Sequence, residues 1–214
     1  MFKSLSAFAD ELALSAGTPE EQMSMLAALG LEYYSPRFFN FSGWRKNVMD
    51  LTEEEVDEIL RVQRLYDMKA ATLGSPIGKV KLVDVDDGTT NVYVPFPQYL
   101  DTKVMHAVRL AERFGTKLIR GFSFYPPKDH DYKRYIPQAV EQIGKIVQLC
   151  EERGLIFGLE VEANLVGRDG ETLKAICMQI QSPHLQLVFD GGNLSTQNMT
   201  ADVVHMEYIR MCAW

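Results

Sequence analysis

The feature of this sequence that most constrains its fold is a regular alternation of strand and helix patterns along the chain. Apolar, β-prone runs alternate with segments whose apolar residues recur at helical spacing. The expected strands are residues 4–8, 31–39, 68–74, 117–125, 154–164 and 185–190, and the expected helices begin near residues 18, 52, 103, 135, 171 and 200. Strand–helix repeats of roughly 30 residues predict a parallel sheet, either open or closed into a barrel.

The turn after the first strand distinguishes these two architectures. An open dinucleotide-binding sheet carries G-x-G-x-x-G there, whereas this chain has ADELALSAG over residues 9–17. We therefore expect an α/β fold of the TIM (β/α)8 type, with six strand–helix units in a single domain over residues 1–214. Functional residues of such barrels follow the carboxyl ends of the strands, and polar groups collect there in this chain, which favours an enzyme over a binding module.

Composition excludes several classes of protein. Apolar residues make up 46% of the chain and the net charge is -7, which argues against a nucleic-acid partner. Three cysteines without metal-type spacing fit a reducing cytoplasm better than a disulfide framework. The amino terminus carries acids where a secretory signal needs an apolar run, and no stretch is long enough to span a membrane. We expect a cytoplasmic protein without a membrane partner.

Acidic residues stand at the ends of the fifth and sixth expected strands. Glu160 and Glu162 lie two apart in GLIFGLEVEAN (154–164), so strand alternation turns both carboxylates to one side, and Asp190 ends the next strand. Neighbouring strands lie about 4.8 Å apart, and no Lys or Arg lies within either strand. One divalent metal ion could balance the charge of both acids. Oxygen ligands favour Mg²⁺ or Mn²⁺, and an additional histidine ligand would admit Co²⁺ or Zn²⁺. The alternative is that these acids are solvated strand ends.

Several short motifs resemble one enzyme family when taken in order. The motifs are FADE (8–11), GSPIGK (74–79), IRGFSFY (119–125), GLEVEAN (158–164) and FDGGN (189–193). Together they resemble the sugar phosphate isomerase/epimerase group of the xylose isomerase-like TIM-barrel superfamily, which also includes endonuclease IV-type AP endonucleases. The resemblance runs over essentially the whole chain and is specific for the superfamily rather than for a substrate.

The resemblance implies roles for particular residues. In such enzymes a divalent metal is held by a Glu on the fifth strand and an Asp on the sixth, which match Glu160 and Asp190. Glu160 is then also one of two glutamates that move a proton next to a sugar carbonyl through an enediolate. Glu162 faces the same cavity and contacts substrate or, as an alternative, the metal, and Asn193 stands where many relatives place a substrate-binding His.

Three further residues are candidate contacts for the sugar or sugar phosphate. Ser75 and Lys79, in GSPIGK, line the substrate mouth or simply form a turn. This segment has the wrong spacing for a nucleotide-binding P-loop, and Val80 follows the lysine where Ser or Thr belongs. Arg37, after the second expected strand, binds an anionic sugar group or is a surface arginine.

The sequence ends at Trp214, within or just after the sixth helix, whereas relatives continue into strands that supply a metal His and a second Glu. A closed barrel typically has about 250 residues. We therefore expect an incomplete barrel lacking the last two units, with a weakly held metal and little or no isomerase activity. Open sheet edges predict a homo-oligomer. The alternative function is a non-catalytic relative that only self-associates.

Overall fold

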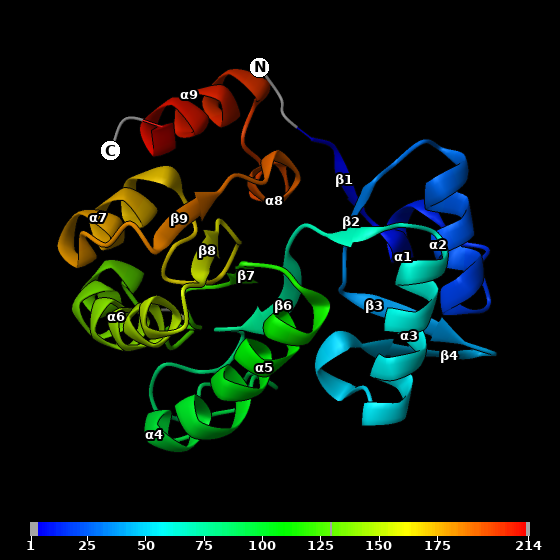
Figure 1. Cartoon of the computed structure of the whole chain (residues 1–214). Helices are drawn as coiled ribbons and strands as arrows, with labels where there is room; N and C mark the ends of the chain where they lie inside the picture. The colour runs from blue at the N-terminus through cyan, green and yellow to red at the C-terminus, as the bar shows by residue number, and fades with distance from the viewer. Residues whose placement is uncertain (1–3, 129, 213–214) are drawn as a thin grey trace. The chain divides into compact units, whose positions relative to one another are not determined.

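The computed structural model describes residues 4–128 and 130–212, which divide into two compact units. The first unit contains the chain up to residue 75 together with residues 106–119, and the second contains residues 76–105 and those from 120 onward. Strands and helices alternate through both units (Figure 1). The expectation of one domain over residues 1–214 stays a prediction.

The first unit is built on a three-stranded parallel sheet in the order β1-β2-β5, with Ser6 opposite Tyr33 and Tyr34 opposite Ala70. An antiparallel hairpin, β3–β4, belongs to the same unit. The elements of this unit are β1 (Ser6–Phe8), α1 (Ala9–Leu12), α2 (Pro19–Ala28), β2 (Tyr33–Ser35), β3 (Phe38–Phe41), β4 (Trp44–Asn47), the 3-10 turn η1 (Val48–Asp50), α3 (Glu53–Leu65), β5 (Lys69–Ala70) and nearly all of α5 (Met105–Phe114).

The helix starts predicted near residues 18 and 52 are confirmed, and each is capped by a threonine. The Thr18 hydroxyl accepts a hydrogen bond from the Glu21 amide at 3.2 Å, and Thr52 forms both bonds of a capping box with Glu55. Gly30 follows α2 with a φ of 76°, a left-handed conformation that glycine adopts without strain. Local side-chain chemistry therefore fixes where these helices begin and end.

Two expected strands are each interrupted, contrary to the prediction. Residues 31–39 form β2 and β3 separately, because Pro36 between them has no amide hydrogen to donate to a ladder. β3 then turns back through Ser42 and Gly43, both at positive φ, to pair with β4. Residues 68–74 likewise divide between β5 and β6 (Leu73–Ile77), which belong to different sheets.

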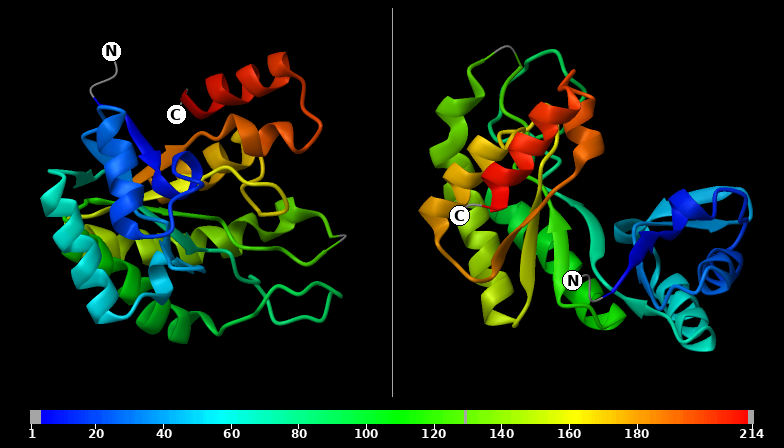
Figure 2. Two further views of the ribbon diagram at one scale, coloured as in Figure 1. Left: turned by 90° about the vertical axis from the view of Figure 1, so that its right-hand side faces the viewer. Right: turned by 90° about the horizontal axis from the view of Figure 1, so that it is seen from above.

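The four-stranded sheet has the order β6-β7-β8-β9, and the residues of β6 and β7 are divided between the two units. β8 and β9 are parallel, with Glu160 opposite Val188. In the second unit α6 packs on β8 and α7 on β9, and α6, α7 and α9 contact one another in series (Figures 1 and 2). The remaining elements are α4 (Phe96–Tyr99), the π-helix η2 (Leu100–Val104), β7 (Leu118–Gly121), η3 (Tyr132–Tyr135), α6 (Ile136–Glu152), β8 (Ile156–Glu160), α7 (Gly170–Ile180), β9 (Leu185–Val188), α8 (Gly191–Ser195) and α9 (Ala201–Cys212).

Two glycines allow close approach inside the second unit. A Cβ placed on Gly121 of β7 would lie 2.3 Å from the ring of Phe157, a fully buried residue of β8. A Cβ on Gly78 would lie 2.0 Å from the Phe122 carbonyl oxygen, and Gly78 has a φ of 91°. The Gly78 amide donates to the Tyr99 hydroxyl at 2.8 Å, so this amide is committed to the fold rather than to a phosphate.

A long-range carboxylate cap joins α9 to α7. Glu207 of α9 is 3% exposed, and its carboxylate accepts a hydrogen bond from the Gly170 amide at 2.6 Å. Gly170 is the first residue of α7, where amides lack partners within the helix. Glu207 also pairs with Arg210, one turn further along α9. The start of α7 is therefore stabilised by a residue far along the chain.

Candidate active site

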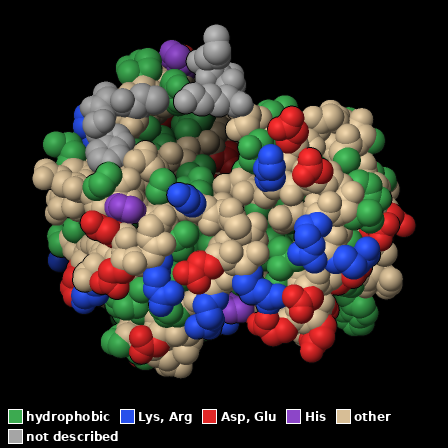
Figure 3. Space-filling model, in the orientation of Figure 1, with side chains coloured by type: hydrophobic (Ala, Val, Ile, Leu, Met, Phe, Trp, Pro, Cys, Tyr) green, Lys and Arg blue, Asp and Glu red, His purple; other side chains and the backbone are tan. Residues whose placement is uncertain are grey.

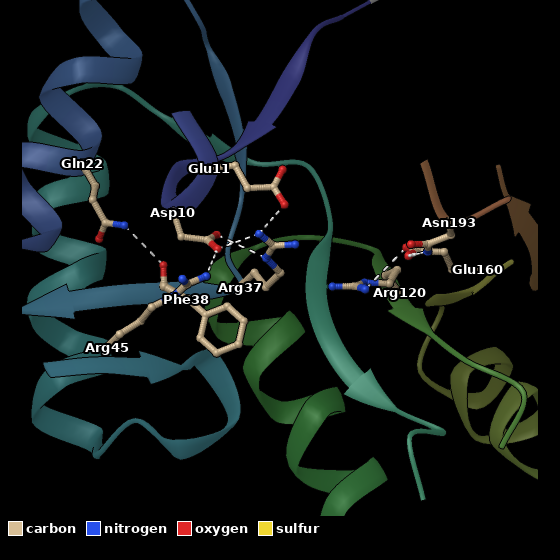
Figure 4. A network of polar contacts seen from close by, with 9 residues as sticks. All are labelled: Asp10, Glu11, Gln22, Arg37, Phe38, Arg45, Arg120, Glu160 and Asn193. Atoms are coloured by element: carbon tan, nitrogen blue, oxygen red, sulfur yellow. Dashed lines mark hydrogen bonds and ion pairs between the residues drawn. The ribbon is translucent and has the colours of Figure 1, made fainter. Parts of the chain in front are cut away.

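The carboxyl ends of β8 and β9 bring together three of the predicted site residues. Glu160 is the last residue of β8 and is 7% exposed. Asp190 follows β9 and accepts a hydrogen bond from the Asn193 amide at 3.0 Å, which caps α8. The Asn193 side chain donates to Glu160 Oε1 at 3.2 Å (Figure 4), and it also donates to the Val161 carbonyl at 3.0 Å. Asn193 thus holds the Glu160 carboxylate in one orientation.

Glu160 has a cationic partner from the preceding strand. Arg120, on β7, places Nη1 3.5 Å from Glu160 Oε2, and both side chains are almost fully buried (Figure 4). The Arg120 guanidinium also lies 4.8 Å from the centre of the Phe122 ring. The inference that these acids lack a basic partner was wrong, because the sequence argument considered only the fifth and sixth strands and not their neighbour.

The environment of Glu160 favours its protonated form. Burial raises the pKa of the Glu160 carboxyl above its ordinary value, and the nearby charges of Asp190 and Glu162 raise it further. Arg120 and Lys79 act in the opposite direction and do not outweigh burial. A buried carboxylate with increased proton affinity, at the carboxyl end of a parallel strand, has the properties of a general base or acid.

Glu162 and Lys79 form a second charged pair beside this cluster. Lys79 Nζ lies 2.7 Å from Glu162 Oε2 and 4.3 Å from the centre of the Phe122 ring. β8 ends at Glu160, so strand alternation does not set the direction of Glu162; its pair with Lys79 does. The negative charge of Glu162 contributes to raising the pKa of the Glu160 carboxyl.

The other two predicted contacts, Arg37 and Ser75, belong to the first unit. Arg37 donates to both oxygens of Asp10 and to Glu11, and its guanidinium lies 4.1 Å from the centre of the Phe8 ring (Figure 4). Ser75 is completely buried in β6. Arg37 is therefore a structural ion-pair residue within its unit, and its predicted role in substrate binding stays untested, as does that of Ser75.

The sequence analysis missed Arg120 and the network around Asp10. Asp10 is 3% exposed and pairs with Arg45 of β4 as well as with Arg37. A lone arginine inside an apolar strand such as LIRGF was a usable signal, because a buried charge requires a partner. Arg45 gave no such signal, since it lies in a hairpin that the sequence did not predict.

The donor set of the Glu160 cluster suits a hard cation. Glu160 and Asp190 supply carboxylate oxygens, and Mg²⁺ or Mn²⁺ is often held by one or two carboxylates with water completing the shell. Within residues 4–128 and 130–212 no group of three His, Cys, Asp or Glu side chains is placed to hold a metal. His184 Nδ1 donates to the Leu155 carbonyl at 2.6 Å, at the opposite end of β8 from Glu160.

Comparisons with known proteins agree with this architecture. A family profile described as "Xylose isomerase-like TIM barrel" matches residues 24–212, and no curated protein matches the chain. A xylose isomerase-like TIM barrel protein from Mycobacterium smegmatis, in complex with magnesium, is 13% identical with a TM-score of 0.68. This chain is covered over 97% of its length and spans 71% of that protein.

Two further solved structures have the same fold. The IOLI protein with a bound zinc atom is 13% identical with a TM-score of 0.68, and the alignment covers 92% of this chain but only 66% of that one. A D-tagatose 3-epimerase-like protein is 15% identical with a TM-score of 0.65, over 94% and 70% of the two chains. At these identities the likeness shows the fold, and coverage of about 70% is consistent with part of a barrel. The predicted α/β architecture of the TIM type is confirmed, and the chain belongs to the xylose isomerase-like TIM barrel family.

Proposed function

We propose that the chain acts on a sugar or sugar phosphate as a metal-dependent isomerase or epimerase. The observation that carries the proposal is the buried Glu160, with raised proton affinity, which shares Asn193 as a hydrogen-bond partner with Asp190 at the carboxyl ends of adjacent strands. Family membership and the resemblance to a D-tagatose 3-epimerase-like protein support this class of reaction.

Proton transfer by Glu160 is the central step of the proposal. The Glu160 carboxylate removes a proton from the carbon next to the sugar carbonyl, and the released electron pair moves onto the carbonyl oxygen to give an enediolate. Return of the proton from Glu160 to the former carbonyl carbon, with the hydroxyl proton passing between the two enediolate oxygens, isomerises the sugar. Epimerisation instead needs a second acid that protonates the original carbon from the opposite face, while Glu160 keeps the proton it removed. Asn193 keeps Glu160 oriented, and the positive charge of Arg120 favours the ionised base.

Glu160 and Asp190 are the residues that would hold a divalent cation. When bound, such an ion supplies positive charge that stabilises the developing oxyanion. Mg²⁺ or Mn²⁺ fits this oxygen donor set best, and Co²⁺ or Zn²⁺ would need a histidine in addition. Two carboxylates alone give a weak site, and one glutamate is only half of an acid–base pair, so we propose low activity for these residues by themselves.

A non-catalytic relative that self-associates is the second candidate. Arg120 already places a positive charge 3.5 Å from Glu160, and this observation favours a cluster stabilised without a metal. In that case the acids and Arg120 are a structural ion-pair network, and the chain binds another copy of itself rather than a sugar.

Metal binding separates the two candidates. Titration of Mn²⁺, followed by electron paramagnetic resonance of the free ion, should show one weak site in the wild type. Glu160→Gln and Asp190→Asn should weaken binding at least about tenfold, and Asn keeps the cap on α8. Glu171→Gln, an exposed acid on α7, is the matched control and should bind as the wild type does. Equal Mn²⁺ affinity of all four proteins would remove the metal assignment.

Turnover tests the reaction itself. A panel of ketoses and ketose phosphates should be converted slowly with Mn²⁺, Mg²⁺, Co²⁺ or Zn²⁺, and Glu160→Gln should abolish conversion while leaving the fold intact. Rapid turnover would contradict the expected weakness of the site. Conversion that survives in Glu160→Gln would remove Glu160 from the mechanism.

The expected partners follow from the surface as well as from the site. Acidic and basic side chains are interspersed on the face shown in Figure 3, in keeping with a small-molecule partner rather than a nucleic acid. Among the described residues, every helix is too short or too polar to cross a lipid bilayer. Cys150 and Cys177 are buried free thiols, which supports the proposed cytoplasmic location.

We further propose a homo-oligomer, because α9 exposes several large apolar side chains, namely Val203, Met206, Tyr208 and Ile209.

A further inference from the structure

A cavity of about 580 Å³ lies within the second unit, between the loops that follow β6, β7 and β8. Its volume is in the range that accommodates a small organic molecule. Tyr125 and Tyr132 contribute aromatic walls, and Asn164 contributes a polar one. Tyr125 and Asn164 end two of the family motifs, but the Glu160 cluster itself contributes no residue to this lining.

Hydrogen bonds hold the walls of the cavity in place. Asp87, in the loop after β6, accepts from Lys81 Nζ at 2.7 Å and from the Lys128 amide at 3.0 Å, which ties this loop to the one after β7. The loop after β8 is tied to the same neighbour, because the Val166 amide donates to the Phe124 carbonyl at 3.0 Å. The cavity is therefore preformed, and a ligand does not have to order its walls on binding.

The wall of the cavity is positively charged although the protein is acidic. The chain has 29 Asp and Glu against 22 Lys and Arg, yet the described lining residues include Lys128 and Arg168 and no carboxylate. Within the described chain neither cation forms an ion pair. Neighbouring Asp169 is occupied by the Tyr132 hydroxyl and by the amino terminus of α7.

Arg168 is held ready to receive an anion. Its Nε donates to Gln197 Oε1 at 3.2 Å, and its guanidinium lies 5.1 Å from the centre of the Tyr132 ring. These contacts fix the side chain and leave its charge uncompensated. A guanidinium presents paired donors that match the oxygens of a phosphate or carboxylate, and Lys128 adds a second positive charge.

The cavity adjoins the Glu160 cluster. The Glu162 amide donates to the Gly167 carbonyl at 3.4 Å, so Glu162 lies beside the loop whose Asn164, Leu165 and Arg168 line the cavity. Glu162 lies two residues beyond Glu160 and pairs with Lys79. A molecule that fills the cavity can therefore extend one end toward the residues to which proton transfer is assigned.

We propose that this cavity binds the anionic end of the substrate, a phosphate ester or a carboxylate, through Arg168 and Lys128. The carbonyl end of the same sugar then meets Glu160. This assignment rests on the proposed function and narrows it, because it excludes a neutral sugar as the preferred substrate.

Calorimetric titration at low ionic strength with three matched hexoses tests the assignment. D-glucose 6-phosphate and D-glucuronate carry an anion at C6, and D-glucose does not. The wild type should bind at least one anionic sugar about tenfold more tightly than glucose. Arg168→Gln and Lys128→Gln should each remove most of that preference. Lys133→Gln, a nearby exposed lysine outside the cavity lining, is the matched control and should keep it.

Each outcome has a defined meaning. Preference for the phosphate alone, for the uronate alone or for both supports the assignment and identifies the group. Equal affinity for the three sugars, or a preference that persists in both variants, overturns it. Lys128→Gln changes an exposed side chain, so its result stands even if Arg168→Gln folds poorly. Titration of Glu160→Gln separates the two proposals. If this variant keeps the preference for anionic sugars but loses turnover, both proposals are supported. If the wild type shows the preference but no turnover, the anion site is supported and the proposed function is contradicted.

Discussion

At the scale of single residues, burial controls the chemistry of the two described cysteines. It raises the pKa of the Cys150 thiol and of the Cys177 thiol to about 12, because neither thiolate can be solvated. A thiol with a raised pKa in the folded state lowers stability at alkaline pH, since the unfolded chain ionises first, near its ordinary pKa of about 8.5.

The thiols should therefore be unreactive in the native protein. In a Cys212→Ala background, which removes a side chain outside the described part of the structure, 5,5′-dithiobis(2-nitrobenzoate) at pH 8 should label neither cysteine until denaturant is added. Both thiols should react at once in 6 M guanidinium chloride. Rapid labelling of the native protein would show that the core around α6 and α7 opens readily.

Asp87 is the residue whose charge state matters most to the loop after β6. Hydrogen bonds from Lys81 and Thr89, together with the Lys128 amide, hold the pKa of the Asp87 carboxyl well below its ordinary value of 3.8. A lowered pKa stabilises the folded state above pH 3.8, and this contribution is lost as the pH falls toward the folded-state value.

Asp87→Asn should lower the urea midpoint at pH 7 and flatten its decline between pH 4 and pH 2. The exposed Asp84→Asn is the control and should leave the midpoint at pH 7 unchanged, because Asp84 has no hydrogen bond or ion pair within the described chain. If the urea midpoints of the wild type and of Asp87→Asn decline in parallel between pH 4 and pH 2, the role given to Asp87 is contradicted.

Single residues also show where sequence reasoning reached its limit at the site. Glu160, Asp190 and Asn193 were identified from motif positions, and the structure brings them together. Arg120 was missed because a basic partner was sought only within the strands of Glu160 and Asp190, whereas it lies 40 residues before Glu160, on the neighbouring strand β7. The cavity was missed because three separate loops form it, and no local pattern predicts such an assembly.

At the scale of elements, β7 and β8 approach as closely as they do because Gly121 has no side chain. Gly121→Ala places a methyl group against the Phe157 ring, so we expect a loss of about 1–3 kcal/mol in the free energy of unfolding. Gly144→Ala, on α6, meets no atom within 4 Å and is the matched control. The free energy of unfolding of Gly144→Ala should rise by roughly 0.5–1 kcal/mol, because alanine is the better helix former. Chemical denaturation measures both, and equal effects would contradict the close packing of β7 on β8.

The elements also explain which parts of the fold were predictable. Helices with regular apolar spacing, such as α3 and α6, begin within a residue or so of residues 52 and 135, where the sequence predicts them. The hairpin β3–β4 was not predicted, since β4 reads WRKN and is exposed at its start. Such a strand is specified by its partner and by the turn at Ser42 and Gly43 rather than by its own composition.

At the scale of the whole molecule, the exposed apolar side chains of α9 bear on self-association. If a homo-oligomer forms through this helix, Met206→Glu with Ile209→Glu should shift the mass measured by light scattering to that of the monomer. Lys174→Glu, a charge change on α7 that leaves these apolar side chains in place, is the control and should leave the mass unchanged. A monomeric wild type at high concentration would exclude self-association, and an oligomer that survives the double substitution would place its interface elsewhere.

The bond between Glu207 and the first amide of α7 has a consequence for synthesis of the protein. The ribosome adds Glu207 37 residues after Gly170, so a nascent chain completes the sequence of α7 well before the carboxylate that caps it exists. Until then, that helix can begin only on its own Asp169, whose side chain accepts from the Thr172 amide. We expect α7 to reach its final stability late in translation, when α9 emerges and docks.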